Sequence, residues 1–443
     1  MNKLDVINYL IEQATALGAS DADAIIIDSS DLSAEVRLGN PTNIQYSQDA
    51  CVSLRVLINQ QQAIVSTSDF TQASLKNILQ HAISMAKVTP ANPHLFLASK
   101  EQLCTQIKAL NLYDAAEPSA EDLLSKAREA EAIALEISEI TNSDGASAGY
   151  SSNKIYFATS NGFTQFYQTS RSSIALSLIA GKDENMQTGY DYSTARFSQD
   201  LKTPKELGNE AARRTISKLL PRKILTAEMP VIFENKIASG LLGAFIGAIN
   251  GSSISRGTSF LCDHLGKEIF NSQINIIDDP FIIKGLASRP FDAEAIAGEK
   301  LNIVEKGRLD HYLLDLQTAH KLKMQTNGRA VRGLSSSPSP SSSNMYILAG
   351  NESLQSMIKS IKKGLFITEI FGHGANIVTG EYSQGAAGFY IENGEILYPV
   401  SEITIAGNLK AMFKQMIPAD DLTFEGGINS PSLLIDKMMI AGV

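Results

Sequence analysis

Apolar residues in the first half of the chain alternate between helical and strand-like spacing, and the same order occurs twice. Stretches in which apolar residues recur every three or four positions predict amphipathic helices. Short runs rich in β-branched and aromatic residues between them predict strands. The predicted helices cover 4–17, a segment after Phe70, about 119–137 and a segment after Thr203; the predicted strands cover 24–27, 34–38, 52–58, 154–158 and 174–179.

Helix-start signals support the second occurrence of this order. Ser119 and Asp122 predict a capped helix start. Thr203 and Glu206 form a capping-box pattern, with Pro204 at the first helical position.

Short sequence matches also relate the two occurrences. The turn pairs 39–40 (GN) and 161–162 (NG) lie at comparable places, and both are typical of hairpins. VSL at 52–54 resembles IAL at 174–176. We therefore predict a helix-strand-strand-strand-helix unit that is duplicated over 1–90 and 119–220. The alternative is a chance similarity between two α+β segments.

The second half of the chain has a different pattern. A linker is predicted at 221–230, followed by a strand at 231–234 and a glycine-rich apolar helix at 239–250. The remainder is strand-rich and interrupted by glycines. The low-complexity stretch LSSSPSPSSSN at 334–344 has little apolar surface to bury, which predicts a mobile loop that borders a cleft.

These patterns predict an α+β protein with two domains. The N-terminal α+β domain covers 1–222, and a C-terminal, strand-rich mixed α/β domain covers 223–443. The length of 443 residues agrees with this division, because it exceeds what one hydrophobic core usually serves.

Composition and charge restrict which partners and which cellular location are expected for this protein. The net charge of −9 disfavours nucleic acid and anionic membrane surfaces as partners. The longest apolar stretch, 237–249, is shorter than the roughly 20 residues that span a bilayer. The three cysteines are widely spaced and form no CxxC pair, so neither a disulfide framework nor a cysteine zinc site is indicated. We expect a soluble, cytoplasmic protein.

Common catalytic signatures are missing from the chain. It contains no GxSxG, GxxxxGK[ST], GxGxxG or HExxH. No two of its six histidines lie three to five positions apart, so no helix presents a chelating pair. The stretch FGHGAN at 371–376, which contains His373, allows close backbone approach, and either tight packing or a role in a cleft would use that space.

Small residues recur every four positions on the predicted helix at 239–250. Ser239, Gly243, Gly247 and Gly251 would form one smooth stripe against which another backbone can pack. Each glycine inside a helix costs about 1 kcal/mol relative to alanine, so the stripe needs a packing or positional reason.

Long stretches of the chain resemble the TldD/PmbA family, once called modulators of DNA gyrase. The resemblance covers essentially the whole chain and is closest to the PmbA branch, also called TldE. The stretches that carry it are LLGAFIGAINGSSISRGTSFL (241–261), GLASRPFDAE (285–294), TNGRA (326–330) and TGEYSQGAAGFYIENGEILYPVSEITIAGNL (379–409).

The resemblance implies a metalloprotease-like domain that lacks its zinc ligands. The active subunit of the family, TldD, carries an HExxxH helix that binds zinc and activates water. The two histidine positions fall here on Gly243 and Ala248, and the glutamate position falls on Ala244. The family's cysteine ligand near the C-terminus has no counterpart in 426–431. We therefore expect no catalytic residue and no cofactor in this chain, with zinc in a partner subunit. The possible cleft-lining residues are Arg256, Asn327, Arg329 and His373.

The resemblance further implies a heterodimer with a TldD-type paralogue. A homodimer is an alternative when the chain is alone. Such complexes close a substrate tunnel beside the partner's zinc and cleave unfolded or small peptides, including microcin precursors and an antitoxin. One alternative is a metalloprotease in its own right with unrecognised ligands. Another is a regulatory binding protein, which would have no basic patch for direct contact with nucleic acid.

Overall fold

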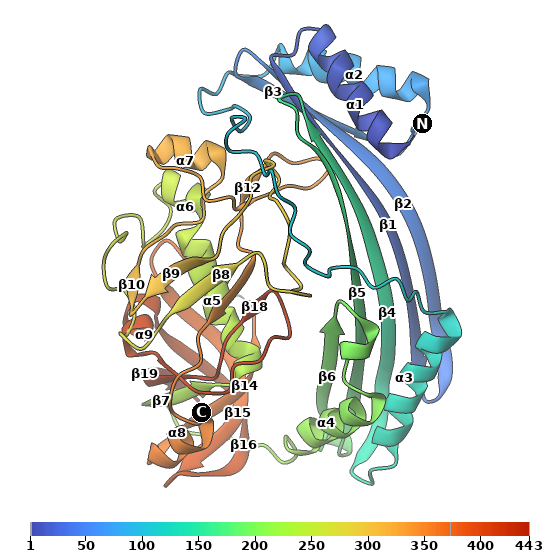
Figure 1. Cartoon of the computed structure of the whole chain (residues 1–443). Helices are drawn as coiled ribbons and strands as arrows, with labels where there is room; N and C mark the ends of the chain where they lie inside the picture. The colour runs from blue at the N-terminus through green and yellow to red at the C-terminus, as the bar shows by residue number, and fades with distance from the viewer. Residues whose placement is uncertain (1, 373, 443) are drawn as a thin grey trace.

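The computed structural model describes residues 2–372 and 374–442. A long, curved antiparallel sheet forms the N-terminal part, and its concave face is turned toward a C-terminal part built on two further sheets (Figure 1). The predicted α+β class, with a strand-rich C-terminal half, is confirmed. Within the described residues, no helix is both long and apolar enough to cross a bilayer.

The N-terminal sheet has the strand order β3-β2-β1-β4-β5-β6. The element order helix-strand-strand-strand-helix occurs twice, as predicted, and the two units meet where β1 and β4 pair at the centre of the sheet. The strands are β1 (Asp21–Arg37), β2 (Asn40–Ile58), β3 (Gln61–Thr67), β4 (Ile140–Thr159), β5 (Thr164–Ala180) and β6 (Gln187–Ala195); the helices are α1 (Lys3–Ala16), α2 (Gln72–Ala86), α3 (Ala120–Leu135) and α4 (Pro204–Ile216).

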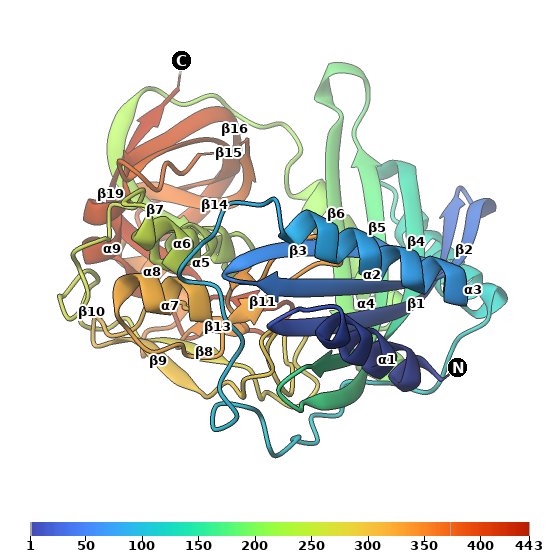
Figure 2. The ribbon, with the colours of Figure 1, turned by 90° about the horizontal axis from the view of Figure 1, so that it is seen from above.

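The four helices cover only one face of this sheet, and Figure 2 shows α1 and α2 side by side over it. Even-numbered residues of β1, such as Ala24 and Ile26, are buried against the helices. Odd-numbered residues therefore face the concave side. Both predicted capping boxes form, at Ser119 and Thr203, and fix where α3 and α4 begin.

One strand differs from its prediction. Residues 24–27 and 34–38 were expected to be separate strands, but β1 runs unbroken from Asp21 to Arg37. The polar residues between them, including Ser29 and Asp31, stay in register with both β2 and β4. Ser29 and Asp31 can do so because their side chains lie on the concave face, where a polar residue need not be buried.

The C-terminal part contains a six-stranded sheet of order β16-β15-β14-β7-β19-β17 and a five-stranded sheet of order β10-β9-β8-β13-β18. One hydrophobic core holds side chains from both sheets and from helix α5 (Asn235–Ile249). The strands are β7 (Ala227–Phe233), β8 (Ile276–Asp279), β9 (Leu301–Glu305), β10 (Arg308–Leu309), β13 (Asn344–Ile347), β14 (Lys363–Phe371), β15 (Glu381–Glu392), β16 (Glu395–Asn408), β17 (Ile417–Pro418), β18 (Ile428–Asn429) and β19 (Leu433–Ala441).

Short elements complete this part of the chain. Strands β11 (Ala330–Val331) and β12 (Ser339–Pro340) form a small ribbon of their own. The remaining helices are α6 (Gly251–Ser255), α7 (Leu316–Leu322), α8 (Leu354–Ser360) and α9 (Leu409–Gln415); two 3₁₀ turns lie at Asp183–Asn185 and Ser198–Asp200.

Two predicted segments are corrected. The linker is shorter than 221–230, because β7 already begins at Ala227 and pairs with β14 and β19. The stretch 334–344 is exposed near its start but packed from Pro338 onward. There β12 pairs with β11, and Ser343 donates two hydrogen bonds to Asp278. Serine composition was taken as a sign of mobility, whereas these hydroxyl and amide groups bind a buried carboxylate.

The two parts of the chain are in direct contact. The segment between α2 and α3 crosses to the C-terminal part, where the amide of Cys104 donates to the carbonyl of Ala295 at 2.8 Å. Asp23 on β1 pairs with Arg55 on β2 and with Arg332, and all three side chains are buried. A mixed apolar cluster, which includes Phe157 of β4 and Phe291, continues this contact.

A buried ion pair in the C-terminal part gives a stability prediction. Asp278 and Arg329 pair with no exposed side-chain surface. Asp278→Ala would leave the Arg329 charge buried and uncompensated, so we expect it to lower the free energy of unfolding by about 3–5 kcal/mol in urea titrations. Arg308→Met, which breaks a surface ion pair with Asp310, is the control and should lower the free energy of unfolding much less. Equal effects of the two substitutions would contradict this account.

Candidate functional site

Helix α5 carries the three positions on which the resemblance places a zinc motif. Gly243 and Ala244 are half-buried, and a Cβ atom at Gly243 would meet no atom within 4 Å. Ala248 is fully buried, and its carbonyl accepts a 2.6 Å hydrogen bond from the Ser259 hydroxyl. The two histidine positions thus have different surroundings, one open and one closed within the core.

The C-terminal segment of the resemblance lies beside this helix. Strand β18 packs against α5, so the structure brings the helix together with the segment 426–431. The side chain of Asn429 accepts from the amides of Glu425 and Gly426 at 3.0 Å and closes a local turn. The Ser430 hydroxyl donates to the carbonyl of Pro431 at 2.7 Å. No residue of this segment offers a thiolate.

The residues at this place do not fit a zinc ion. Glycine and alanine side chains have no donor atoms, and a zinc site needs about four donors of the imidazole, thiolate or carboxylate type. Among residues 2–372 and 374–442, no three His, Cys, Asp or Glu side chains form a group that could hold a metal. No step through zinc can therefore be assigned to this chain's own side chains.

Of the expected cleft-lining residues, Asn327 and Arg329 lie together, and the guanidinium group of Arg329 donates to the carbonyl of Asn327 at 2.9 Å. Arg329 is buried in the C-terminal part, where it pairs with Asp278 and donates to the carbonyl of Glu299 at 2.6 Å, so it does not line a cleft. The Asn327 side chain accepts from the amide of Leu314 at 2.9 Å and donates to the carbonyl of Tyr312 at 2.7 Å.

The other two candidates have no assigned role. Arg256 is exposed just after α6. His373 lies outside the described residues. The polarity of a residue alone therefore did not distinguish side chains that hydrogen-bond within the loops from side chains that face a ligand.

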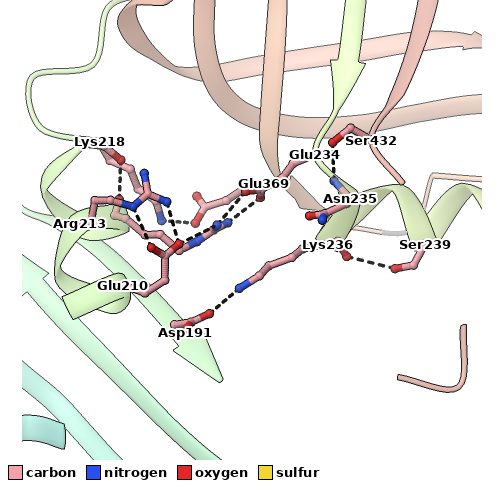
Figure 3. Close-up of polar contacts among 12 residues, drawn as sticks. Asp191, Glu210, Arg213, Lys218, Glu234, Asn235, Lys236, Ser239, Glu369 and Ser432 are labelled. Atoms are coloured by element: carbon pink, nitrogen blue, oxygen red, sulfur yellow. Dashed lines mark hydrogen bonds and ion pairs between the residues drawn. The ribbon is translucent and has the colours of Figure 1, made fainter. Parts of the chain in front are cut away.

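A network of charged residues holds the start of α5 against the N-terminal part, a signal that the sequence reading missed. Figure 3 shows Lys236 of α5 reaching Asp191 of β6, and Lys202 pairs with the same carboxylate at 2.8 Å. Burial alone would raise the pKa of Asp191, but the hydrogen bonds from the two lysines hold it below its usual range. Beside them, Arg214 of α4 pairs with Glu234 at 2.6 Å. The helix is thus fixed from both parts of the chain.

The concave face of the N-terminal sheet changes character along its strands. Toward one end of β1, Ile25 and Ile27 take part in the apolar contact with the C-terminal part. Toward the other end, Asp31 and Ser33 line an open hollow of about 380 Å³. The other polar residues that line this hollow are Gln45, Ser47, Tyr150, Ser151, Arg171 and Ser173.

A second hollow lies at the edge of the same sheet. It measures about 550 Å³ and lies between β6 and the sheet of β14, β15 and β16, where Tyr190 and Phe371 line it. Tyr190 is 56% exposed. The two hollows present hydroxyl, amide and aromatic groups together with the charged side chains of Asp31, Arg171, Glu369 and Glu402.

Comparison with known sequences places the whole chain in one group. Sequence models of the PmbA/TldA metallopeptidase match it at residues 22–86 (domain 1), 113–219 (central domain) and 226–442 (C-terminal domain). The Metalloprotease PmbA homolog of Haemophilus influenzae is 37% identical over 98% of this chain and 95% of its own length. Metalloprotease PmbA of Escherichia coli O157:H7 is 36% identical over 96% and 94%. A Metalloprotease TldD homolog of Buchnera aphidicola is 28% identical over 53% and 52%.

Solved structures agree with this placement. A candidate modulator of DNA gyrase from Bacteroides thetaiotaomicron superposes with a TM-score of 0.90 at 26% identity, over 99% of this chain and 98% of that chain. TldE from Thermococcus kodakarensis superposes with a TM-score of 0.89 at 19% identity, over 99% and 100%, and so shares the fold. The three domain matches and the full-length relatives establish that this chain belongs to the PmbA/TldD metallopeptidase family.

Proposed function

We propose that this chain is the non-catalytic, PmbA/TldE-type subunit of a two-subunit metalloprotease. In this proposal it pairs in the cytoplasm with a TldD-type paralogue and completes the substrate tunnel beside the zinc of that partner. The substrates are unfolded or small peptides, of the microcin-precursor or antitoxin type. The observation that carries the proposal is the zinc-motif helix α5, which has Gly243, Ala244 and Ala248 where donors would be needed.

The presence of the family scaffold without zinc donors supports a role in assembly. Helix α5 keeps its place in the C-terminal core, β18 lies beside it, and charged contacts from Lys236 and Glu234 tie its start to the N-terminal part. A helix held this firmly, yet without a ligand or general base, is suited to shaping a surface. It cannot supply zinc chemistry, because no side chain at these positions can bind a metal or remove a proton from water.

The concave face supports the substrate class. Its serine, glutamine and tyrosine side chains can bond to a peptide backbone whatever the peptide sequence is. An unfolded peptide has unpaired backbone donors and acceptors along its whole length. A face of this composition would therefore hold many such peptides with little selectivity.

The alternative, a protease in its own right, rests on the name metalloprotease that the full-length relatives carry. The zinc content of the purified chain distinguishes a non-catalytic subunit from a protease in its own right. A structural or catalytic zinc site binds its metal tightly, so about one zinc per purified chain would favour the alternative.

The first prediction concerns activity. The isolated chain should leave unfolded peptides intact with or without added zinc, since it has no donor set, and it should raise the cleavage rate of a co-purified TldD-type paralogue. The measurement is a peptide-cleavage assay with each chain alone and with both. Chelator-sensitive cleavage by the isolated chain would defeat the proposal. A paralogue that never associates with this chain, or that is fully active without it, would do the same.

The second prediction uses the open space at Gly243. Gly243→Trp should abolish activation of the paralogue without unfolding the chain, because a Cβ atom at this position has no atom of this subunit within 4 Å and the bulky ring can extend outward from there. Gly243→Ala is the matched control. It should preserve activation and stabilise the helix by up to about 1 kcal/mol. Circular dichroism and thermal melting check the fold. Normal activation by the tryptophan variant would show that this face of α5 contacts neither partner nor substrate.

A further inference from the structure

A separate cavity lies where the concave face of the N-terminal sheet meets the C-terminal part. It measures about 200 Å³, which corresponds to about six or seven water volumes. Its walls are mostly apolar, and Arg289, Arg332, Asp292 and Tyr167 are the charged and polar residues among them. The apolar residues of the wall are Ile25, Ile27, Ile155, Phe157, Phe291, Ala293, Ala330 and Val331.

Arg289 has no partner for most of its guanidinium group. Its Nε and Nη2 atoms are buried and have no hydrogen-bond acceptor among the residues that the structure describes. Arg289 lies deep in the chain yet keeps some accessible surface, and it is one of the residues that line this cavity. Burial lowers the pKa of Arg289, which shows that its surroundings disfavour the charge.

The nearby carboxylates are engaged elsewhere. Asp278 is paired with Arg329 and accepts two hydrogen bonds from Ser343. Asp292 accepts from the amides of Ile296 and Ala330 at 2.9 and 3.0 Å, and from that of Glu294 at 2.8 Å. Asp292 and Asp278 attract the charge of Arg289, but among the described residues neither accepts a hydrogen bond from its Nε or Nη2 atoms, which are left for a group that enters the cavity.

The other residues that line the cavity indicate which chemical group would bind beside Arg289. Burial raises the pKa of Tyr167, so its hydroxyl remains a hydrogen-bond donor near neutral pH. A guanidinium group and a hydroxyl suit a carboxylate, because both donate and the guanidinium can bind it with two parallel bonds. The isoleucine and phenylalanine walls suit an apolar side chain next to that carboxylate. The volume admits about one residue.

We propose that this cavity binds the C-terminal carboxylate of a short peptide that ends in an apolar residue. The half-buried members of the wall, Ile27, Ile155, Tyr167 and Val331, place its opening on the concave face of the sheet. The rest of the peptide can continue there over the polar hollow. The site differs from the zinc-motif helix in its residues, and its test needs neither zinc nor a partner subunit.

The test is calorimetric titration of the full chain with the tetrapeptide Ser-Ala-Ala-Leu and with its C-terminal amide. The acid should bind, and the amide should bind at least about tenfold more weakly, because the charge-assisted hydrogen bonds to Arg289 are lost. Arg289→Met should remove the difference between acid and amide. Arg308→Met, the same change at an exposed arginine, should preserve it. Equal binding of acid and amide, or no binding of either, overturns the proposal. Competition by inorganic phosphate as strong as by the acid also overturns it, since the site would then take any anion.

The melting temperature of the ligand-free variant separates a binding role from a structural one. An arginine kept for a ligand is buried at a cost, so Arg289→Met should leave the melting temperature unchanged or raise it. A marked fall on this substitution would show that the arginine serves packing, and it would overturn the proposal even if peptide binding were also lost.

Discussion

The arrangement of the two parts of the chain depends on one buried carboxylate. Asp23, on the central strand β1, pairs with Arg55 of the neighbouring strand and with Arg332, which follows β11 in the C-terminal part. Arg332 also donates to the Ser53 hydroxyl at 3.1 Å. A charge taken out of water without a partner costs several kcal/mol, so these groups hold together only in one relative position of the sheet and the C-terminal part. The placement of the concave face, of α5 and of the cavity beside Arg289 follows from that position.

Neighbouring arginines show two different uses of buried charge. Arg329 has an ion pair with Asp278 and donates to carbonyl groups, so its charge contributes to a closed interior. Arg289 lies close to both but lacks such partners among the described residues. The two are separated by 40 positions, and the sequence presents each in a glycine- or proline-flanked loop. Only the contacts reveal which arginine is satisfied and which is available.

Local patterns were sufficient to predict most of the fold. Helix periodicity and the capping residues Ser119 and Thr203 predicted helices close to their observed bounds, because these signals act within one turn of the chain. The unbroken strand β1 was missed because its polar middle is tolerated by a solvent-facing side of the sheet. The packing of 338–344 was missed because it depends on Asp278, more than 50 positions away. The spacing of residue types along the chain does not reveal which residues far apart in sequence will be in contact.

The candidate site was predictable only as far as the family resemblance reached. That resemblance identified α5 and the segment 426–431, which the structure places side by side. It did not indicate the charged contacts that anchor the helix, since Lys236 and Asp191 belong to different parts of the chain. Two of the expected cleft residues are instead part of the loop interior, for a related reason. Asn327 and Arg329 are polar because loops need side chains that satisfy backbone groups inside the protein.

Gly243 gives information about the role of helix α5, which has no zinc donors. A Cβ atom there would meet nothing in this chain, and those at Gly240 and Gly247 would make ordinary contacts of 3.5 and 3.6 Å with Ile370 and Ile377. Alanine would fit these three positions, and each glycine costs the helix about 1 kcal/mol relative to it. Packing within the subunit therefore does not explain Gly243. The open side of α5 at Gly243 leaves room for a group from outside the chain, and this favours a helix face that borders a partner or its substrate.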